Sequence, residues 1–235
     1  MGEVKNDVQN MKNTMDVDIN HILNRIVYTG PRHPSITVLS ALQQAFLLTV
    51  PFENLDIHYD RPILLEPGVA EQKIVNERRG GLCYESNGLL HRLLETMGFQ
   101  IRMCSAQMMH EGTLSPAYDH MALIAKIDGH EFLVDVGNGE SVRTPMRLDS
   151  QEVSTTPEGK MYRIRRCDGM PALEVCTIES QEWQPRFVVN PTACKLEEFA
   201  DRCQFHQTSE ESFFTRQPLV TLALPDGRAT LEGRT

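Results

Sequence analysis

The spacing of the apolar residues changes near Gly98, and this change restricts the folds that the chain can adopt. Before Gly98, apolar residues recur every three or four positions, as on the buried face of an amphipathic helix. After it, short runs alternate apolar and polar residues between turn residues, as in antiparallel strands. The expected fold class is therefore α+β, with helices first and an antiparallel sheet or barrel second.

The same patterns locate the individual elements. Helices are expected over 18–27 (with Asp16 or Asp18 as N-cap), from 35 to the stop at Pro51, over 70–78, from 83 to 98, and over 195–202. Strands are expected over 100–108, 120–127, 131–137, 161–167, 172–178, 218–224 and 228–232, the last two joined around Asp226-Gly227. The chain then divides into a helical part (1–98), a β part (99–190) and a mixed α/β part (191–235).

Composition and charge exclude several classes of protein. The 235 residues are 40% apolar and 23% charged, which is ordinary for a globular protein with its own core. Lys plus Arg number 23 against 32 Asp plus Glu, and the net charge of −9 argues against nucleic acid or an anionic membrane as partner. The start of the chain lacks the apolar core of a secretory signal, and no apolar run approaches the ~18 residues of a membrane span.

The six cysteines contain no C-x-x-C pair, so neither a zinc site nor a dithiol redox site is expected. Free thiols in a reducing cytoplasm are the expectation, and five of the six are expected to pack as small apolar residues. No metal site and no tightly bound cofactor are expected.

Cys83 differs from the other cysteines in its position. It follows Gly80-Gly81 and opens the expected helix, where the dipole and the unpaired amides favour a reactive thiolate. The same amides can hold the oxyanion of a tetrahedral intermediate. On local features alone, a Gly-Gly connection before a buried structural cysteine is the favoured explanation, so a partner base has to decide.

A predicted hairpin supplies that base. Asp128-Gly129 separates two alternating apolar runs, which is the strongest short-range hairpin signal. With a two-residue turn, the numbers of paired residues sum to about 257, so Asp135 lies opposite Ala122, two residues from His120 on the same face. An imidazole with a carboxylate on one ring nitrogen can accept a proton from a thiol on the other. The sequence thus predicts a Cys83, His120 and Asp135 nucleophilic triad.

Five short segments resemble motifs of the arylamine N-acetyltransferases. Residues 50–56 read VPFENLD, and residues 79–87 read RGGLCYESN, similar to the family's nucleophile segment. Residues 119–121 (DHM) and 133–137 (LVDVG) match its His and Asp segments in order and spacing, and residues 208–214 resemble its later T-S-x-x-S-x-F loop. The resemblance runs from about Ile19 to the end of the chain.

The resemblance implies a fold and an activity. The fold is a helical bundle with the nucleophile, an antiparallel β-barrel with His and Asp (a cysteine-protease-like core), and an α/β lid over 191–235. The activity is acetyl transfer from acetyl-CoA, as co-substrate, through a cysteine thioester to an arylamine, arylhydrazine or N-hydroxyarylamine in a ping-pong cycle typical of xenobiotic metabolism. The oligomeric state is not indicated.

The resemblance also implies roles for single residues. By position, Cys83 is the nucleophile, His120 the base and Asp135 its orienting carboxylate. Phe52 and Phe214 match positions that line the acceptor pocket, and simple core packing would explain each equally well. An ion pair between Arg79 and Glu85 is expected to bracket the Gly80-Gly81 turn as a structural feature. Glu53 and Asn54 are expected to anchor the loop after the second helix.

The sequence departs from the family pattern at two places that bear on function. Asn138 stands where the family usually has Phe after the D-V-G segment, beside the expected active site. The chain also stops at Thr235, soon after the last expected hairpin, so a shortened lid is expected.

Other activities fit a Cys-His-Asp triad. An amide synthase that closes a macrolactam would use the same fold and triad on an acyl chain from a carrier protein. A cysteine peptidase or a transglutaminase-like hydrolase would use the same three residue types. A catalytically degenerate binding protein is disfavoured because all three triad positions are filled.

Overall fold

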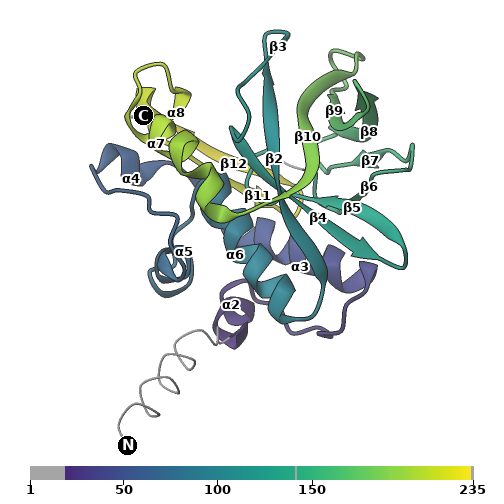
Figure 1. Ribbon diagram of the computed structural model, residues 1–235, viewed down its shortest axis with the longest axis horizontal. Coiled ribbons are helices and arrows are strands. Elements are labelled where there is room, and N and C mark those ends of the chain that lie inside the picture. Colours follow the sequence, from purple (N-terminus) through teal and green to yellow (C-terminus); the bar gives the residue numbers. More distant parts are fainter. Residues whose placement is uncertain (1–18, 141, 234–235) are drawn as a thin grey trace, which may run out of the picture.

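The computed structural model describes residues 19–140 and 142–233, so the expected N-caps Asp16 and Asp18 lie outside the described residues. Helices dominate the first part of the chain (Figure 1). The helical elements are α2 (Ile19–Arg25), α3 (Ile36–Thr49), α4 (Leu55–His58), α5 (Val69–Glu71), the π turn η1 (Gln72–Asn76), α6 (Cys83–Thr96), the 3₁₀ turn η2 (Leu196–Phe199), α7 (Ala200–Thr208) and α8 (Phe213–Arg216).

The two long helices begin and end where their sequences predict. The Ser35 side chain caps α3 by accepting a hydrogen bond from the Val38 amide at 3.3 Å, and Pro51 follows its end. Gly98 follows α6 with a φ of 86°, a left-handed conformation that glycine adopts without strain. The predicted helix over 70–78 is instead a single turn, α5, continued by the π turn η1.

Most strands form one antiparallel sheet, which curls into a nearly closed barrel. Its order is β6-β5-β4-β2-β10-β9-β8-β7, and β3 pairs with β2 beside this path. The strands are β2 (Gln100–His110), β3 (Thr113–Leu114), β4 (His120–Ile127), β5 (His130–Val134), β6 (Met146–Arg147), β7 (Ser154–Thr155), β8 (Met161–Cys167), β9 (Met170–Cys176) and β10 (Gln184–Cys194). The hydroxyl of Thr144, shortly before the edge strand β6, lies 3.2 Å from the hydroxyl of Ser154 in the edge strand β7.

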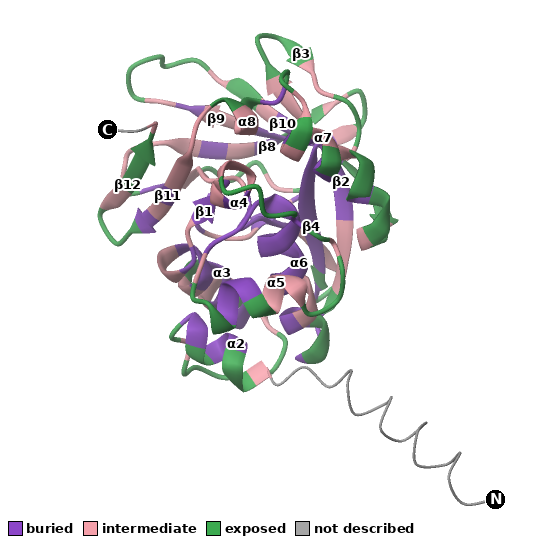
Figure 2. Cartoon of the chain, turned by 90° about the vertical axis from the view of Figure 1, so that its left-hand side faces the viewer, coloured by how far each residue is buried: buried purple, intermediate pink, exposed green. Residues whose placement is uncertain are grey.

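Strand β4 is buried on both faces because it separates two cores. Leu123, Ala125 and Ile127 pack against the helices, whereas Ala122 and Ile124 point into the barrel. A strand covered on both sides reads as a nearly continuous apolar run, as residues 121–125 do. Buried segments accordingly gather on α6 and β4 in Figure 2.

The hairpin between β4 and β5 has the predicted register. Ile127 pairs with His130 and Leu123 with Val134, so the numbers of paired residues sum to 257. Asp128 and Gly129 have φ values of 51° and 83°, as a two-residue type I′ turn requires. His120 and Asp135 therefore emerge at the open end of this hairpin.

Strand β10 was not among the predicted strands. It contains Pro185 and Pro191, which cannot donate to a ladder and so argue against a central strand. The structure accommodates both prolines at register shifts, one between Pro185 and Phe187 and one between Val189 and Ala193. The strand passes through the predicted boundary between 190 and 191.

A second, three-stranded sheet joins distant parts of the chain. Its order is β1-β11-β12, from β1 (Phe52–Glu53), β11 (Leu219–Leu224) and β12 (Gly227–Glu232). The predicted hairpin near Asp226 is present, but Leu224 pairs with Gly227, so Pro225 and Asp226 form its turn. Proline favours the first corner of such a turn because its φ is already fixed. Among the described residues, no helix is both long and apolar enough to span a bilayer.

Candidate active site

Cys83 is the first residue of α6, as the sequence predicts, and its side chain lies among buried apolar residues. The residue is 6% exposed. Gly80 precedes it where the chain crosses the end of α3. A Cβ on Gly80 would overlap the carbonyl oxygen of Pro51, so close backbone approach explains this glycine. Gly81 is hydrogen-bonded to strand β1, because its carbonyl oxygen accepts a hydrogen bond from the Glu53 amide at 3.2 Å.

Gly137 holds the barrel against the start of α6. A Cβ at Gly137 would lie 2.5 Å from the Cα of Cys83 and 2.7 Å from the side-chain nitrogen of Asn87. Only a residue without a side chain permits this approach. The segment after β5 therefore lies directly on the backbone of Cys83.

His120 and Asp135 form a buried hydrogen-bonded pair. Nε2 of His120 lies 2.9 Å from Oδ2 of Asp135, and the two residues are 3% and 0% exposed. Cys83 lies close enough to the His120 side chain to act on its charge, and the His120 ring lies 5.2 Å from the ring of Phe187. Because Nε2 faces Asp135, Nδ1 is the ring nitrogen left for the thiol. The structure thus brings the three predicted residues together.

The charges of the pair stabilise each other. Burial acts to lower the pKa of His120, but the negative charge of Asp135 and the contact with Cys83 outweigh it and raise that pKa. Burial likewise acts to raise the pKa of Asp135, and the imidazolium lowers it instead.

Asn87 supports the pair, a contribution that the sequence analysis did not assign. Its Nδ2 donates to Oδ1 of Asp135 at 2.9 Å and to the Met121 carbonyl at 2.7 Å. Its Oδ1 accepts from the Val136 amide at 3.0 Å. Asn87 lies one helical turn after Cys83, on the same face of α6. Its spacing of four residues from the nucleophile was therefore the sequence signal that could have assigned it to the site.

Glu85 and Arg79 take part in a buried ion cluster, defined here as Glu53, Asp56, Lys73, Arg79 and Glu85. The predicted ion pair between Arg79 and Glu85 is wrong. Within the described part of the chain, Arg79 pairs with Glu53 (2.8 Å) and Asp56, whereas Glu85 accepts from Lys73 at 2.9 and 3.0 Å. The lysine comes from the π turn η1, which the sequence pattern did not reveal.

The ion cluster fixes the entrance to α6. Oε2 of Glu85 accepts from the Leu82 amide at 2.9 Å, so this amide is not available to an oxyanion. Oε2 of Glu53 accepts from the Leu55 amide at 2.6 Å. Burial acts to lower the pKa of Lys73, but the surrounding carboxylates outweigh it and raise the pKa. The role of the cluster is therefore to hold backbone in place.

A cleft of about 980 Å³ opens above Cys83 and His120. Phe52 and Phe214 both line it, and their ring centroids lie 5.8 Å apart. Asn54, expected to anchor the loop after α3, instead ties this wall together. Its side chain donates to the carbonyls of Phe214 and Gln217 and accepts from the Leu219 amide at 2.7 Å.

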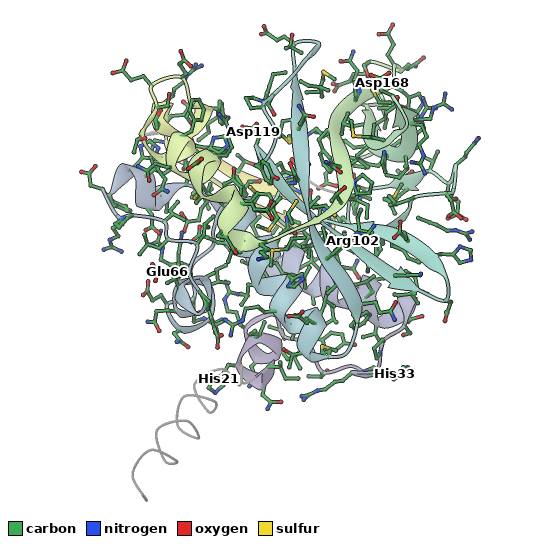
Figure 3. All side chains as sticks on the ribbon, viewed as in Figure 1. His21, His33, Glu66, Arg102, Asp119 and Asp168 are labelled. Atoms are coloured by element: carbon green, nitrogen blue, oxygen red, sulfur yellow. The ribbon has the colours of Figure 1, made fainter. Side chains whose placement is uncertain are left out.

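Asp119 precedes His120 and faces the other way, toward α7 (labelled in Figure 3). It accepts hydrogen bonds from Arg202 and lies 3.2 Å from Nε2 of His206. Burial acts to raise the pKa of Asp119, but these partners lower it. The Asp119 carboxylate thus holds α7 beside the cleft through its contacts with Arg202 and His206. The described residues contain no group of three or more His, Cys, Asp or Glu side chains placed to hold a metal ion.

Comparisons with known proteins agree on one family. A family model described as N-acetyltransferase matches residues 35–235. An arylamine N-acetyltransferase of Escherichia coli (strain K12) is 30% identical over 222 residues, 89% of this chain and 74% of that protein. The structure of the arylamine N-acetyltransferase from Salmonella typhimurium matches with a TM-score of 0.85 at 27% identity, over 93% of this chain and 80% of that one.

A structure of the Mycobacterium marinum arylamine N-acetyltransferase in complex with CoA matches with a TM-score of 0.83 at 28% identity, over 92% of this chain and 81% of that one. The family model matches most of the chain, and the two related structures have the same fold. The chain therefore belongs to the arylamine N-acetyltransferase family.

Proposed function

We propose that this protein transfers an acetyl group from acetyl-CoA to an arylamine, arylhydrazine or N-hydroxyarylamine through a thioester on Cys83. The observation that carries the proposal is the buried chain of contacts from Cys83 to His120 and from His120 to Asp135 at 2.9 Å, of which Cys83 and His120 line the cleft. A nucleophile, a base and an orienting carboxylate in this order are the parts that acyl transfer needs.

In the first half-reaction, the Cys83 thiol gives its proton to Nδ1 of His120. The thiolate attacks the carbonyl carbon of acetyl-CoA, and a tetrahedral intermediate forms. Its collapse breaks the bond to the CoA sulfur, which takes the proton from the imidazolium and leaves as CoA. Asp135 stabilises the imidazolium and keeps the ring oriented throughout.

In the second half-reaction, the amine nitrogen attacks the thioester carbon. His120 takes a proton from the attacking nitrogen, the Cys83 sulfur leaves, and the product is an amide. The sulfur and the imidazolium return to their starting state. Because the acetyl group stays covalently bound to Cys83 between the two steps, both substrates can bind in the same cleft, one after the other.

The nature of the two substrates rests on two further observations. The Mycobacterium marinum relative has been solved in complex with CoA, which supports acetyl-CoA as the acyl donor here. The aromatic pair Phe52 and Phe214 on the cleft wall supports an aromatic acceptor, because aromatic rings pack favourably against one another.

We also infer that the protein works in a reducing compartment, with the cytoplasm as the proposed location. All six cysteines are free thiols, and Cys83 must remain a thiol to react. Oxidation of this sulfur would remove the nucleophile.

The proposal predicts one acetyl group on Cys83 after incubation with acetyl-CoA alone. Intact-mass measurement should show a single acetyl adduct, and peptide mapping should locate it on Cys83. Addition of an arylamine such as 4-methoxyaniline should then remove the adduct and release the acetylated amine.

The matched controls are two cysteine variants. Cys83→Ser should form no adduct, whereas Cys167→Ser, on the far strand β8, should acetylate like the parent. A folded parent that forms no adduct would contradict acetyl-CoA as donor and would favour an acyl-carrier substrate, as in an amide synthase.

A further inference from the structure

His206 on α7 contacts two other elements that border the cleft. Its Nε2 lies 3.2 Å from the carbonyl oxygen of Asp119, which directly precedes β4, and 3.2 Å from Oδ1 of the same residue. Its Nδ1 lies 3.4 Å from Oγ of Ser212, which directly precedes α8. All three residues are buried, and all three line the cleft. One imidazole thus connects α7 to the start of β4 and to α8, which lies beside α7 in Figure 1.

The hydrogen bonds around the ring show which of its nitrogens carry hydrogen. Oγ of Ser212 donates its only hydrogen to the His206 carbonyl oxygen at 3.1 Å. At its other contacts Oγ can then only accept, from the Phe214 amide at 3.2 Å and from Nδ1 of His206. Nε2 faces two oxygen acceptors of Asp119. Because both ring nitrogens face acceptors, the doubly protonated imidazolium is the form that satisfies them.

A neutral ring requires a different set of hydrogen bonds. Nδ1 then has to accept the Ser212 hydrogen, and the His206 carbonyl loses the one donor that it has among the described residues. A buried carbonyl without a donor costs free energy. The charge of Asp119 also favours the imidazolium. Burial acts to raise the pKa of Asp119, but the hydrogen bond with His206, followed by that with Arg202, outweighs it and lowers the pKa.

The other titratable and charged groups around the ring come from three helices. Arg202, one turn earlier on α7, shares the Asp119 carboxylate with the ring. The ring of Tyr84 on α6 lies 6.1 Å away between centroids, and its hydroxyl donates to the Asp119 carbonyl. On α4, Nε2 of His58 lies 3.1 Å from the Phe214 carbonyl. Asp119 is therefore the carboxylate that the imidazolium neutralises, together with Arg202.

Ser212, His206 and Asp119 are also the residue types of a serine-hydrolase triad, but their geometry excludes that role. A nucleophilic serine gives its hydrogen to the imidazole. The Ser212 hydrogen goes to a backbone carbonyl, and its oxygen caps α8. The ring therefore holds elements in place and takes no part in a second nucleophilic site.

Loss of the ring proton weakens these connections. One ring nitrogen becomes an acceptor that faces an oxygen atom, so either its bond is lost or Ser212 must withdraw its hydrogen from the His206 carbonyl. Ser212 caps α8 through the Phe214 amide, and the Phe214 ring lies 5.1 Å from the His206 ring. The charge of the imidazole thus acts on the cleft wall that carries Phe214.

We propose that His206, as an imidazolium, is a positioning residue that holds the Phe214 wall of the cleft against the segment leading into His120. This inference rests on the proposed function, because it concerns binding of the acceptor amine at the same site. His206 moves no proton in the reaction, since its two nitrogens are occupied by Asp119 and Ser212. Deprotonation of the ring loosens the wall and weakens binding of the acceptor.

The first test follows the ring in the isotope-labelled parent protein by NMR from pH 5.5 to 9. At the lowest pH, both ring nitrogens of His206 should carry hydrogen. The amide signal of Phe214, which donates to Ser212, should shift with the same midpoint as the ring. A ring with one N–H at the lowest pH, or a Phe214 amide that does not follow the ring, would overturn the proposal.

The second test measures the KM for 4-methoxyaniline in the second half-reaction. From pH 6 to 9 this KM should rise about threefold or more in the parent, because a charge-assisted hydrogen bond is lost. In His206→Gln, which has no charge to lose, it should stay within twofold. At each pH, kcat should differ less than twofold between the two proteins. His130→Gln, with an exposed ring 3.5 Å from Asp149, is the matched control and should follow the parent.

Failure of this proposal is distinguishable from failure of the proposed function. If acetyl-Cys83 forms and the KM of His206→Gln depends on pH as in the parent, the positioning role is wrong and the acetyltransferase stands. If the folded parent forms no acetyl-Cys83, the proposed function fails, and the role of His206 in acceptor binding fails with it. The NMR titration then still decides whether the ring holds α8.

Discussion

Two buried charged regions flank Cys83, and they differ in how they are built. The pair of His120 and Asp135 has two charges, comes from one hairpin, and is held by neutral groups, namely the Asn87 amide and the Gly137 amide. The ion cluster has three acids and two bases, and each acid pairs with at least one base. Neither region can replace the other.

The difference separates chemistry from support. The hydrogen-bond donors around Asp135, apart from His120, are neutral, so they do not cancel its negative charge. That charge therefore stabilises the positive charge of the His120 imidazolium, which lies next to Cys83. In the ion cluster, opposite charges satisfy each other, and what remains is the fixed position of the backbone at Leu82 and Leu55. Variants in the first region should therefore change rates, and variants in the second should change stability.

The largest expected effect is on Asp135→Asn. Loss of the carboxylate removes the partner that favours the imidazolium, so the second-order rate of Cys83 alkylation by iodoacetamide at pH 7 should fall by about 10³-fold or more. Rapid-quench alkylation followed by peptide mapping measures this rate. Circular dichroism should show a folded variant. A rate equal to that of the parent would remove His120 and Asp135 from the triad.

The next largest effect is on Lys73→Met, which leaves Glu85 and Asp56 buried without their shared cation. The free energy of unfolding in urea should fall by about 3–5 kcal/mol, because an uncompensated buried charge is costly. Exposed Lys126→Met is the matched control, with an expected change within about 0.5 kcal/mol. A marginal change in Lys73→Met would mean that the cluster does not support the fold.

Asn87→Ala tests the link between the regions, since α6 carries both Asn87 and Glu85. The variant removes partners from Asp135, from the Met121 carbonyl and from the Val136 amide. We expect a loss of about 1–3 kcal/mol in the free energy of unfolding. Alkylation at neutral pH should slow but remain faster than in Asp135→Asn. A variant as slow as Asp135→Asn would make Asn87 indispensable to the pair.

A further effect concerns pH and needs no substitution. The pKa of His120 is raised in the folded protein, so the folded state binds an extra proton between the unfolded value of ~6.5 and the folded value. The stability from this pair is fully present below ~6.5 and is lost as pH rises through the folded pKa, by up to about 1.4 kcal/mol per pH unit. Urea unfolding from pH 6 to 9 should show this decline in the parent.

The same experiment on Asp135→Asn provides the contrast, because its imidazole has no carboxylate partner. The decline between pH 6 and 9 should be weaker in this variant than in the parent. Equal slopes in the two proteins would assign the pH dependence to another group.

The comparison also explains what the sequence could and could not predict. The hairpin of β4 and β5 was predictable in register because Asp128-Gly129 fixes it locally. The ion pairs of the ion cluster were not predictable. Lys73 lies in the π turn η1, and the spacing of residues in a regular helix does not indicate that its side chain reaches Glu85. β10 was missed because prolines normally exclude a central strand, and its bulges became visible only with its neighbours in place. The catalytic roles of the triad residues stay predictions.

The wall that carries Phe52 and Phe214 has a consequence for synthesis of the protein. β1 pairs with β11, and Asn54 bonds residues more than 150 positions later. During translation, this side of the cleft cannot close until β11 has left the ribosome, whereas the β4–β5 hairpin can form long before. The hairpin that carries His120 and Asp135 can therefore form first, and the cleft wall beside Cys83 is completed only when β11 pairs with β1.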